Sequence, residues 1–215
     1  MRTYGDGCGI AHGLDLIGER WALLVVRELL LGPKRFTDLR GGLPNVSPNV
    51  LAQRLRELEA AAVVRRRKLP PPAGSWTYEL TEWGEQLKPI VMSLGSWALR
   101  SPAFPGNDAP VSMDSVILAL GTFFDAGAAE GISVRYELRL GEHTFHVRVA
   151  DQTIELGRGG TADADAIIET DVRTLRALIW EGLELEDAVQ AGDVEIEGNR
   201  DGVARFLELF PQPVG

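Results

Sequence analysis

A proline-rich stretch near the middle of the chain separates two halves of opposite charge. Residues 101–110 contain three prolines, a glycine and small polar side chains, which is typical of a linker between domains. Residues 1–100 carry a net charge of +4 and residues 101–215 a net charge of −13, within a total of −9 over 215 residues. This asymmetry favours two domains, the first of which suits an anionic partner. We therefore predict domains at residues 1–100 and 113–215, joined by a linker at residues 101–112.

The composition excludes several classes of protein. Hydrophobic residues make up 45% of the chain and charged residues 25%, as in globular proteins. No apolar run approaches the roughly 18 residues that a membrane helix needs, and the first residues lack the apolar core of a secretory signal. Cys8 is the single cysteine, so no internal disulfide forms and a cytoplasmic location is expected. With three histidines besides, the chain offers little for a metal site, and we expect no metal or other cofactor.

The first half has the pattern of a small helical domain with one β-hairpin. Ser47 and Pro48 mark the start of a helix, because serine is a good N-cap and proline suits the first helical position. Helix, tight turn, helix and hairpin is the layout of a winged helix-turn-helix. The expected helices are residues 10–17, 21–31, 36–40, 47–61 and 81–100, and the expected strands are residues 63–69 and 76–80.

The helix that begins at Ser47 has a polar stripe suited to the major groove. If Leu51 faces the core, Asn49, Gln53 and Arg56 lie within about 40° of the direction opposite Leu51 around the helix axis. Asparagine and glutamine pair with adenine, and arginine pairs with guanine. The alternative interpretation is a solvated polar face, which any surface helix has.

Cations flank this helix in the sequence. Lys34 and Arg35 precede a helix at its N-terminus, where cations are unfavourable unless an anion such as phosphate passes there. Four consecutive cations on the first hairpin strand suit phosphate contacts, or else form a charged edge that resists aggregation. The expected DNA-binding residues are Lys34, Arg35, Ser47, Asn49, Gln53, Arg54, Arg56, Arg65, Arg66, Arg67 and Lys68.

Five separated blocks resemble the HxlR family of bacterial winged-helix transcription regulators, which are relatives of MarR. The blocks are CGI at residues 8–10, LIGERWALLVVRELL at 16–30, GPKRFTDL at 32–39, LAQRLRELE at 51–59 and YELTEWG at 78–84. The resemblance covers residues 8–100. It implies binding to double-stranded DNA as a homodimer, with two recognition helices in successive major grooves. It also implies a dimer interface formed by the first and last helices, residues 10–17 and 87–98.

The chain departs from the family pattern at three places. Glu19 stands where a second glycine is usual. Ala62 stands where a glycine usually ends the recognition helix, so this helix is expected to run on or to end less cleanly. The hairpin tip, residues 70–75, is longer than usual and uncharged, which weakens the case for a minor-groove contact there. Cys8 is the N-terminal cysteine that some family members use to sense oxidants, and His12 lies one turn further on. The alternatives for Cys8 are a redox sensor, with a thiol pKa lowered by the helix N-terminus, and a packing residue.

The second half mixes helices with alternating strand patterns. Residues 132–140, 145–149 and 154–156 alternate with period two, and turns of hairpin length separate them. We predict an α+β fold with a mostly antiparallel sheet. The further expected elements are helices at residues 113–128, 172–181, 186–191 and 202–210 and strands at residues 166–170 and 194–197.

The order of these elements resembles the type-two sterol carrier protein family. The resemblance rests on DADAIIET at residues 163–170, GLELEDAVQAGDVEIEG at 182–198 and FLELF at 206–210. It implies an apolar tunnel for a small ligand such as a fatty acyl chain or a sterol; the alternative is that the same side chains fill a solid core. Trp180 points away from the core face of its helix, as at a ligand mouth, a domain interface or a dimer contact. The expected ligand-binding residues are Phe124, Tyr136, Leu138, Phe145, Val147, Leu178, Trp180, Phe206 and Phe210.

Together these features predict a DNA-binding transcription repressor whose operator affinity depends on a small apolar ligand in the second domain. Two other functions stay open: a lipid-binding or scaffold protein whose winged helix contacts proteins, and a regulator that senses oxidants through Cys8. No set of residues with catalytic spacing supports an enzyme.

Overall fold

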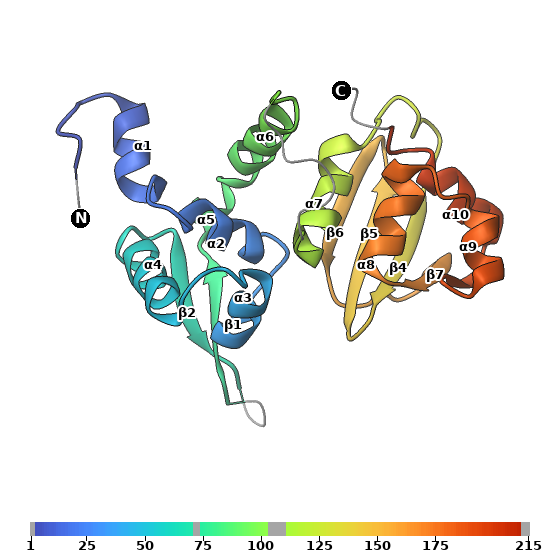
Figure 1. Ribbon diagram of the computed structural model, residues 1–215, viewed down its shortest axis with the longest axis horizontal. Coiled ribbons are helices and arrows are strands. Elements are labelled where there is room, and N and C mark those ends of the chain that lie inside the picture. The colour runs from blue at the N-terminus through green and yellow to red at the C-terminus, as the bar shows by residue number, and fades with distance from the viewer. Residues whose placement is uncertain (1–2, 71–73, 103–110, 212–215) are drawn as a thin grey trace. The chain divides into compact units, whose positions relative to one another are not determined.

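The computed structural model describes residues 3–70, 74–102 and 111–211 (Figure 1). The chain divides into two compact units, Met1–Trp97 and Ala98–Gly215. Part of the predicted hairpin tip (residues 71–73) and part of the predicted linker (residues 103–110) lie outside the described residues. Within the described segments, no helix is long and apolar enough to cross a membrane.

The first unit is a winged helix-turn-helix. Strands β1, β2 and β3 form an antiparallel sheet in the order β1-β3-β2. Leucines and valines from α2, α3, α4 and the bases of β2 and β3 pack into one hydrophobic core. The elements are α1 (Gly9–Ile17), α2 (Ala22–Leu29), β1 (Lys34–Arg35), α3 (Phe36–Gly42), α4 (Pro48–Ala60), β2 (Val64–Lys68), β3 (Trp76–Leu80), α5 (Glu82–Glu85) and α6 (Lys88–Leu99).

Helix α4 has defined caps at both ends. The Ser47 hydroxyl accepts a hydrogen bond from Val50 N at 3.3 Å, as its N-cap position predicts. At the other end, Ala62 N donates to Glu59 O and Val63 N donates to Leu58 O, each at 3.0 Å, which is a Schellman motif. The motif puts Ala62 in the left-handed region, with φ +56°. The expectation of a less defined end is therefore wrong: the missing glycine leaves a strained alanine instead of a longer helix.

The predicted helix at residues 81–100 is two helices. Thr81 caps α5 by accepting a hydrogen bond from Gly84 N at 3.0 Å. A Cβ at Gly84 would lie 2.1 Å from Val63 O, so this turn packs directly against the backbone that follows α4. Pro89, which lacks an N–H group, lies in the first turn of α6, where proline is tolerated.

The second unit is α+β, with a five-stranded sheet in the order β6-β5-β4-β7-β8. Every neighbouring pair is antiparallel except β4 and β7, so the predicted mostly antiparallel sheet is confirmed. Helices α7 and α8 lie in front of the sheet in the view of Figure 1. The elements are α7 (Met113–Phe123), β4 (Val134–Leu140), β5 (His143–Ala150), β6 (Thr153–Arg158), β7 (Ala166–Thr170), α8 (Val172–Arg176), the π-helical turn η1 (Ala177–Glu181), α9 (Leu185–Ala191), β8 (Glu195–Gly198) and α10 (Arg200–Leu207).

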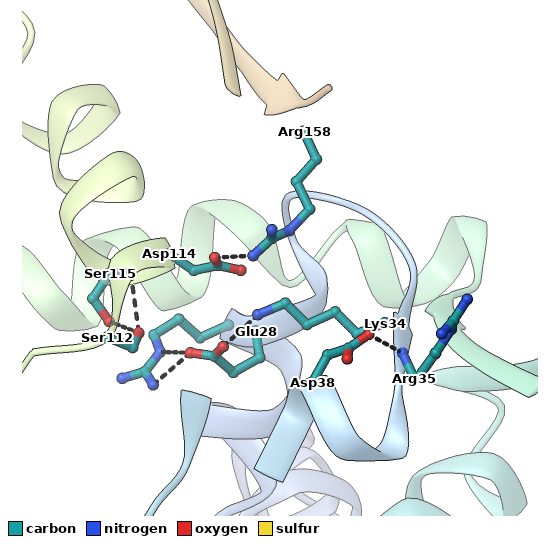
Figure 2. A network of polar contacts seen from close by, with 9 residues as sticks. Glu28, Lys34, Arg35, Asp38, Ser112, Asp114, Ser115 and Arg158 are labelled. Carbon is teal, nitrogen blue, oxygen red and sulfur yellow. Dashed lines mark hydrogen bonds and ion pairs between the residues drawn. The ribbon is translucent and has the colours of Figure 1, made fainter. Parts of the chain in front are cut away.

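Two polar contacts fix helices of the second unit to the sheet. The Tyr136 hydroxyl on β4 donates to Gly202 O on α10 at 2.8 Å. Burial, together with the nearby Asp165 carboxylate, raises the pKa of Tyr136 to about 12, so the phenol keeps its proton. Arg158 on β6 forms an ion pair with Asp114 in the first turn of α7 (Figure 2).

Candidate nucleic-acid interface

The outer face of α4 presents the predicted polar stripe. Asn49, Gln53 and Arg56 are exposed, while the leucines on the opposite face of the helix are buried. Gln53 Nε2 donates to Glu57 Oε1 at 3.0 Å, one turn along the same helix. Arg56 is exposed and forms no ion pair with any residue that the structure describes. The arrangement exposes amide and guanidinium groups, which are groups that hydrogen-bond to base edges in major grooves.

Arg54 belongs to the interior, which corrects its assignment as a DNA contact. Its side chain is 9% exposed and its Nη1 lies 2.5 Å from Glu57 Oε2 and 3.6 Å from Glu19 Oε2. The guanidinium therefore joins α4 to the turn between α1 and α2. Glu19, which replaces a usual family glycine, supplies one of the two carboxylates.

Lys34 is also buried and needs a second correction. Lys34 Nζ lies 2.5 Å from Glu28 Oε2 (Figure 2). Arg27 Nη2 lies 2.8 Å from the other oxygen of the same carboxylate. Burial raises the pKa of Glu28, but the neighbouring Lys34 and Arg27 outweigh burial, so the net pKa is below its usual value. The lysine therefore stabilises the fold between α2 and β1 instead of reaching phosphate.

Arg35 keeps an exposed side chain next to this buried pair. It belongs to β1, and its backbone N–H donates to Asp38 Oδ2 at 3.0 Å, which caps α3 (Figure 2). The cation at the start of this helix is thus balanced locally by an acidic side chain in the first turn. Of the two predicted cations here, only Arg35 is available to a phosphate.

The four cations of β2 divide between the two faces of the hairpin. Arg65 Nε lies 2.7 Å from Glu79 Oε1, and Arg67 Nε lies 3.4 Å from Glu79 Oε2. Arg66 points to the other face, where its guanidinium lies over the ring of Trp76, at 4.3 Å from the ring centroid. Lys68 shares that second face and is exposed. The wing therefore has one face on which Glu79 offsets part of the positive charge, and a second face to which neither strand contributes an acidic residue.

Cys8 is exposed at the N-cap position of α1. Hydrogen bonding from the backbone N–H groups of Ile10 and Ala11 lowers the pKa of its thiol. His12, one turn along, is exposed as well, and its backbone N–H donates to Cys8 O at 3.0 Å. The thiol is thus accessible to solvent, and its pKa lies below that of an ordinary cysteine.

Most of the predicted ligand-binding residues of the second unit are buried in its core. Phe206 links two aromatic contacts, because its ring centroid lies 4.7 Å from that of Tyr136 and 4.9 Å from that of Phe210. Phe124 contacts Phe210 at 6.3 Å. The buried members are Tyr136, Leu138, Phe145, Val147, Leu178, Phe206 and Phe210, whereas Phe124 is half-buried.

Trp180 lies apart from this cluster. It belongs to the π-helical turn η1, is half-buried, and packs edge-on against Phe123 of α7 at 5.6 Å. Its indole Nε1 is buried and has no hydrogen-bond partner among the residues that the structure describes. π-helical turns of this kind are frequent at functional sites.

Sequence reasoning missed the three carboxylates that organise the cations of the first unit. Glu79 and Glu19 lie far along the chain from Arg65 and Arg54, the cations that they contact, whereas Glu28 contacts the nearby Lys34 across the turn between α2 and β1. The strand register was the one available signal, because it places Glu79 directly opposite Arg65. Within the described parts of the chain, no group of three metal-ligating side chains is present.

A family model described as HxlR-like helix-turn-helix matches residues 16–102, and a second model, described as alkyl sulfatase C-terminal, matches residues 109–214. The expected resemblance of the second half to sterol carrier proteins is not confirmed, since the matching family has a different name. The family that matches the second half is named after an enzyme, whereas the relatives of the first half are transcriptional regulators.

Two relatives from Bacillus subtilis (strain 168) illustrate the similarity of the first half. The chain is 40% identical to the uncharacterized HTH-type transcriptional regulator YvaP over 93 residues, which are 42% of this chain and 86% of that protein. It is 39% identical to the HTH-type transcriptional regulator YodB over 84 residues, which are 39% of this chain and 75% of that protein.

Among solved structures, the redox regulator HypR in its oxidized form is 32% identical to this chain. The match has a TM-score of 0.42 and covers 45% of this chain and 100% of HypR. The extent of the match to YvaP, together with the family model over residues 16–102, identifies the first half as a helix-turn-helix regulator. The chain belongs to the HxlR-like family of helix-turn-helix transcriptional regulators.

Proposed function

We propose that this chain is a homodimeric transcription repressor that reads duplex DNA with α4 and whose DNA affinity is modulated by a small apolar ligand bound to the second unit. The observation that carries the DNA-reading role is the outer face of α4. Asn49, Gln53 and Arg56 are exposed there, and the neighbouring Arg54 is turned inward. A stripe of amide and guanidinium groups on one helix is the chemistry of base readout.

The two helices that flank the first unit support a dimer. Within a single chain, neither α1 nor α6 contains a buried residue. Both carry large apolar side chains that are exposed to water, which favours the burial of these side chains against a partner. These side chains are Ile10, Leu14, Ile90, Leu94 and Trp97. A two-fold dimer places two copies of α4 on half-sites one helical turn apart.

The matched family and the aromatic cluster support an apolar ligand in the second unit. Alkyl sulfatases are named for substrates that carry an alkyl chain, which is apolar. The cluster around Phe206 is an apolar environment that such a chain prefers to water. A ligand that binds one conformation of the dimer more tightly than another shifts the equilibrium between them. The DNA affinity then changes, typically by about 5- to 150-fold.

The test is fluorescence anisotropy with duplexes enriched from a random library by the purified protein. DNA affinity is expected to fall steeply as salt rises from 50 to 200 mM, and palmitate or cholesterol is expected to shift it. Absence of salt-dependent DNA binding would favour a scaffold protein whose winged helix contacts proteins. A lipid that binds the protein without changing DNA affinity would refute the coupling.

A second candidate function, redox sensing through Cys8, is favoured by the exposed thiol and its lowered pKa. Among the relatives, HypR is named a redox regulator, and YodB was solved after diamide treatment and with quinone bound. Diamide is expected to change the DNA affinity of the wild type and to leave that of Cys8→Ser unchanged. An equal response in both would exclude Cys8 as the sensor.

A further inference from the structure

The wing strand β2 carries four cations in a row, but they occupy two different electrostatic environments. Strand register places Arg65, Arg67, Glu79 and Thr77 on one face of the hairpin. Glu79 is 7% exposed and contacts both arginines, so part of their charge is neutralised at a nearly buried carboxylate. These two arginines hold β2 against β3.

The opposite face carries positive charge with no acidic residue from either strand. Its members are Val64, Arg66 and Lys68 from β2 and Trp76, Tyr78 and Leu80 from β3. At the base of the hairpin, Val64 and Leu80 are buried in the core shared with α4. Arg66 and Lys68 therefore extend from the face on which the helices pack, beyond the part that those helices cover.

Arg66 is held in place by aromatic rings. Its guanidinium carbon lies 4.3 Å from the centroid of Trp76 and 5.9 Å from the centroid of Tyr78. Trp76 is 47% exposed, so burial in the core does not account for this side chain. A cation over an indole is stabilised without losing its outward N–H donors, and the stack restricts a side chain that otherwise samples many rotamers.

We propose that Arg66 is the wing residue that contacts the DNA backbone, and that Trp76 is a positioning residue that orients its guanidinium. Arg65 and Arg67 then act in the hairpin through Glu79. The proposal rests on DNA binding by the first unit, and it assigns different roles to three arginines that are consecutive in the sequence. Phosphate is the expected contact, because basic residues on such elements fix the register of a protein on the duplex and carry no sequence information.

The first comparison uses two adjacent arginines of the same strand, on full-length protein and a duplex enriched from a random library by the wild type. Arg66→Ala is expected to lower affinity roughly five- to tenfold at 0.1 M salt and to reduce the slope of log affinity against log salt by about 0.9 per contact. Arg67→Ala removes the same charge, leaves Arg65 on Glu79, and is expected to change affinity less than about twofold. Equal losses in both variants overturn the division of the cations.

The second comparison isolates Trp76. Trp76→Leu is expected to weaken binding about two- to fivefold, as loss of an exposed cation–π contact predicts. Trp76→Tyr is expected to restore most of this loss. In the Arg66→Ala background, Trp76→Leu is expected to have no further effect, whereas an undiminished effect there overturns the positioning role.

Two controls separate this proposal from its premise. Thermal unfolding of each variant is expected to match the wild type, because both Arg66 and Trp76 are exposed. Wild-type protein that enriches no duplex and shows no salt-dependent binding refutes DNA binding itself. Wild-type protein that binds DNA with an affinity indifferent to Arg66 refutes only the wing assignment.

Discussion

At the scale of single residues, position and environment decide what each arginine does. Arg54 and Arg56 are two residues apart on α4, yet Arg54 pairs with Glu57 and Glu19 inside the unit and Arg56 faces solvent. Arg65, Arg66 and Arg67 alternate in the same way along β2. The helical and strand periods predict which side chains share a face, but they do not predict which face holds a buried carboxylate.

Arg56 is expected to carry base recognition. Arg56→Ala should cost roughly 1–3 kcal/mol of binding free energy and relax the preference at one or two base pairs, because a bidentate contact to guanine is lost. Selection of duplexes from a random library by each variant measures the preference. Weaker binding with an unchanged preferred sequence would show that Arg56 contacts only the backbone.

Ala62 is a position where a smaller residue should stabilise the protein. A left-handed conformation costs an L-residue roughly 1–2 kcal/mol, and glycine avoids this strain at an entropic cost of about 0.5–1 kcal/mol. Ala62→Gly should therefore raise the free energy of unfolding by about 0.5–1 kcal/mol in urea titrations. Ala61→Gly is the matched control, because Ala61 has φ −82° and should instead lose stability.

At the scale of elements, the parts predicted well have local signals. Ser47 caps α4 as expected, and β3 spans the predicted residues 76–80. The strand β1 and the break between α5 and α6 were missed, since β1 exists only through its pairing with β3, and Gly84 packs on the distant Val63 carbonyl. Such tertiary contacts leave no periodic pattern in the sequence.

The Glu28–Lys34 pair should make the junction of α2 and β1 sensitive to acid. Because the pKa of Glu28 is lower in the folded than in the unfolded state, its stabilisation is present above roughly pH 4.3 and is lost as pH falls through the lowered folded value. Glu28→Gln should cost about 3 kcal/mol at pH 7, as expected for a broken buried pair.

Urea unfolding between pH 7 and pH 3 should show the difference between Glu28→Gln and the wild type shrinking as the pH falls. Glu155→Gln is the matched control, because it breaks the exposed pair with Arg148 and should cost less than about 1 kcal/mol. A loss for Glu28→Gln that stays constant down to pH 3 would contradict the ionic origin of the stabilisation.

At the scale of the whole molecule, the sequence predicted both fold classes, because the winged helix and the alternating strands each have strong local patterns. It did not distinguish a hollow second unit from a filled one. The predicted lining residues Phe145 and Phe206 are 0% and 1% exposed. The same apolar pattern serves to line a tunnel or to fill a core, so the distinction depends on packing.

Native mass spectrometry should show a dimer. Ile10→Asp with Leu94→Asp should shift it to monomer, because charges in the apolar faces of α1 and α6 oppose their burial against a partner. Val111→Asp is the control, since Val111 is as exposed as Leu94 (45% and 44%) but lies in the second unit. A co-purified mass of a few hundred daltons on the second unit would identify the class of the ligand, and a dimer that survives both aspartates would place the interface elsewhere.

The hydrogen bond between Tyr136 and Gly202 joins residues 66 positions apart and also has a consequence for synthesis. The phenol on β4 remains without this partner until α10 has left the ribosome, and β4 completes its sheet only with β7 and β8. The strand pairings of the winged helix all lie within residues 34–80, so they are able to form about 120 residues before Gly202 is added. A nascent chain therefore contains the whole helix-turn-helix unit before the acidic second unit is complete, and a chain interrupted at that stage is a fragment with a net charge of +4 over residues 1–100.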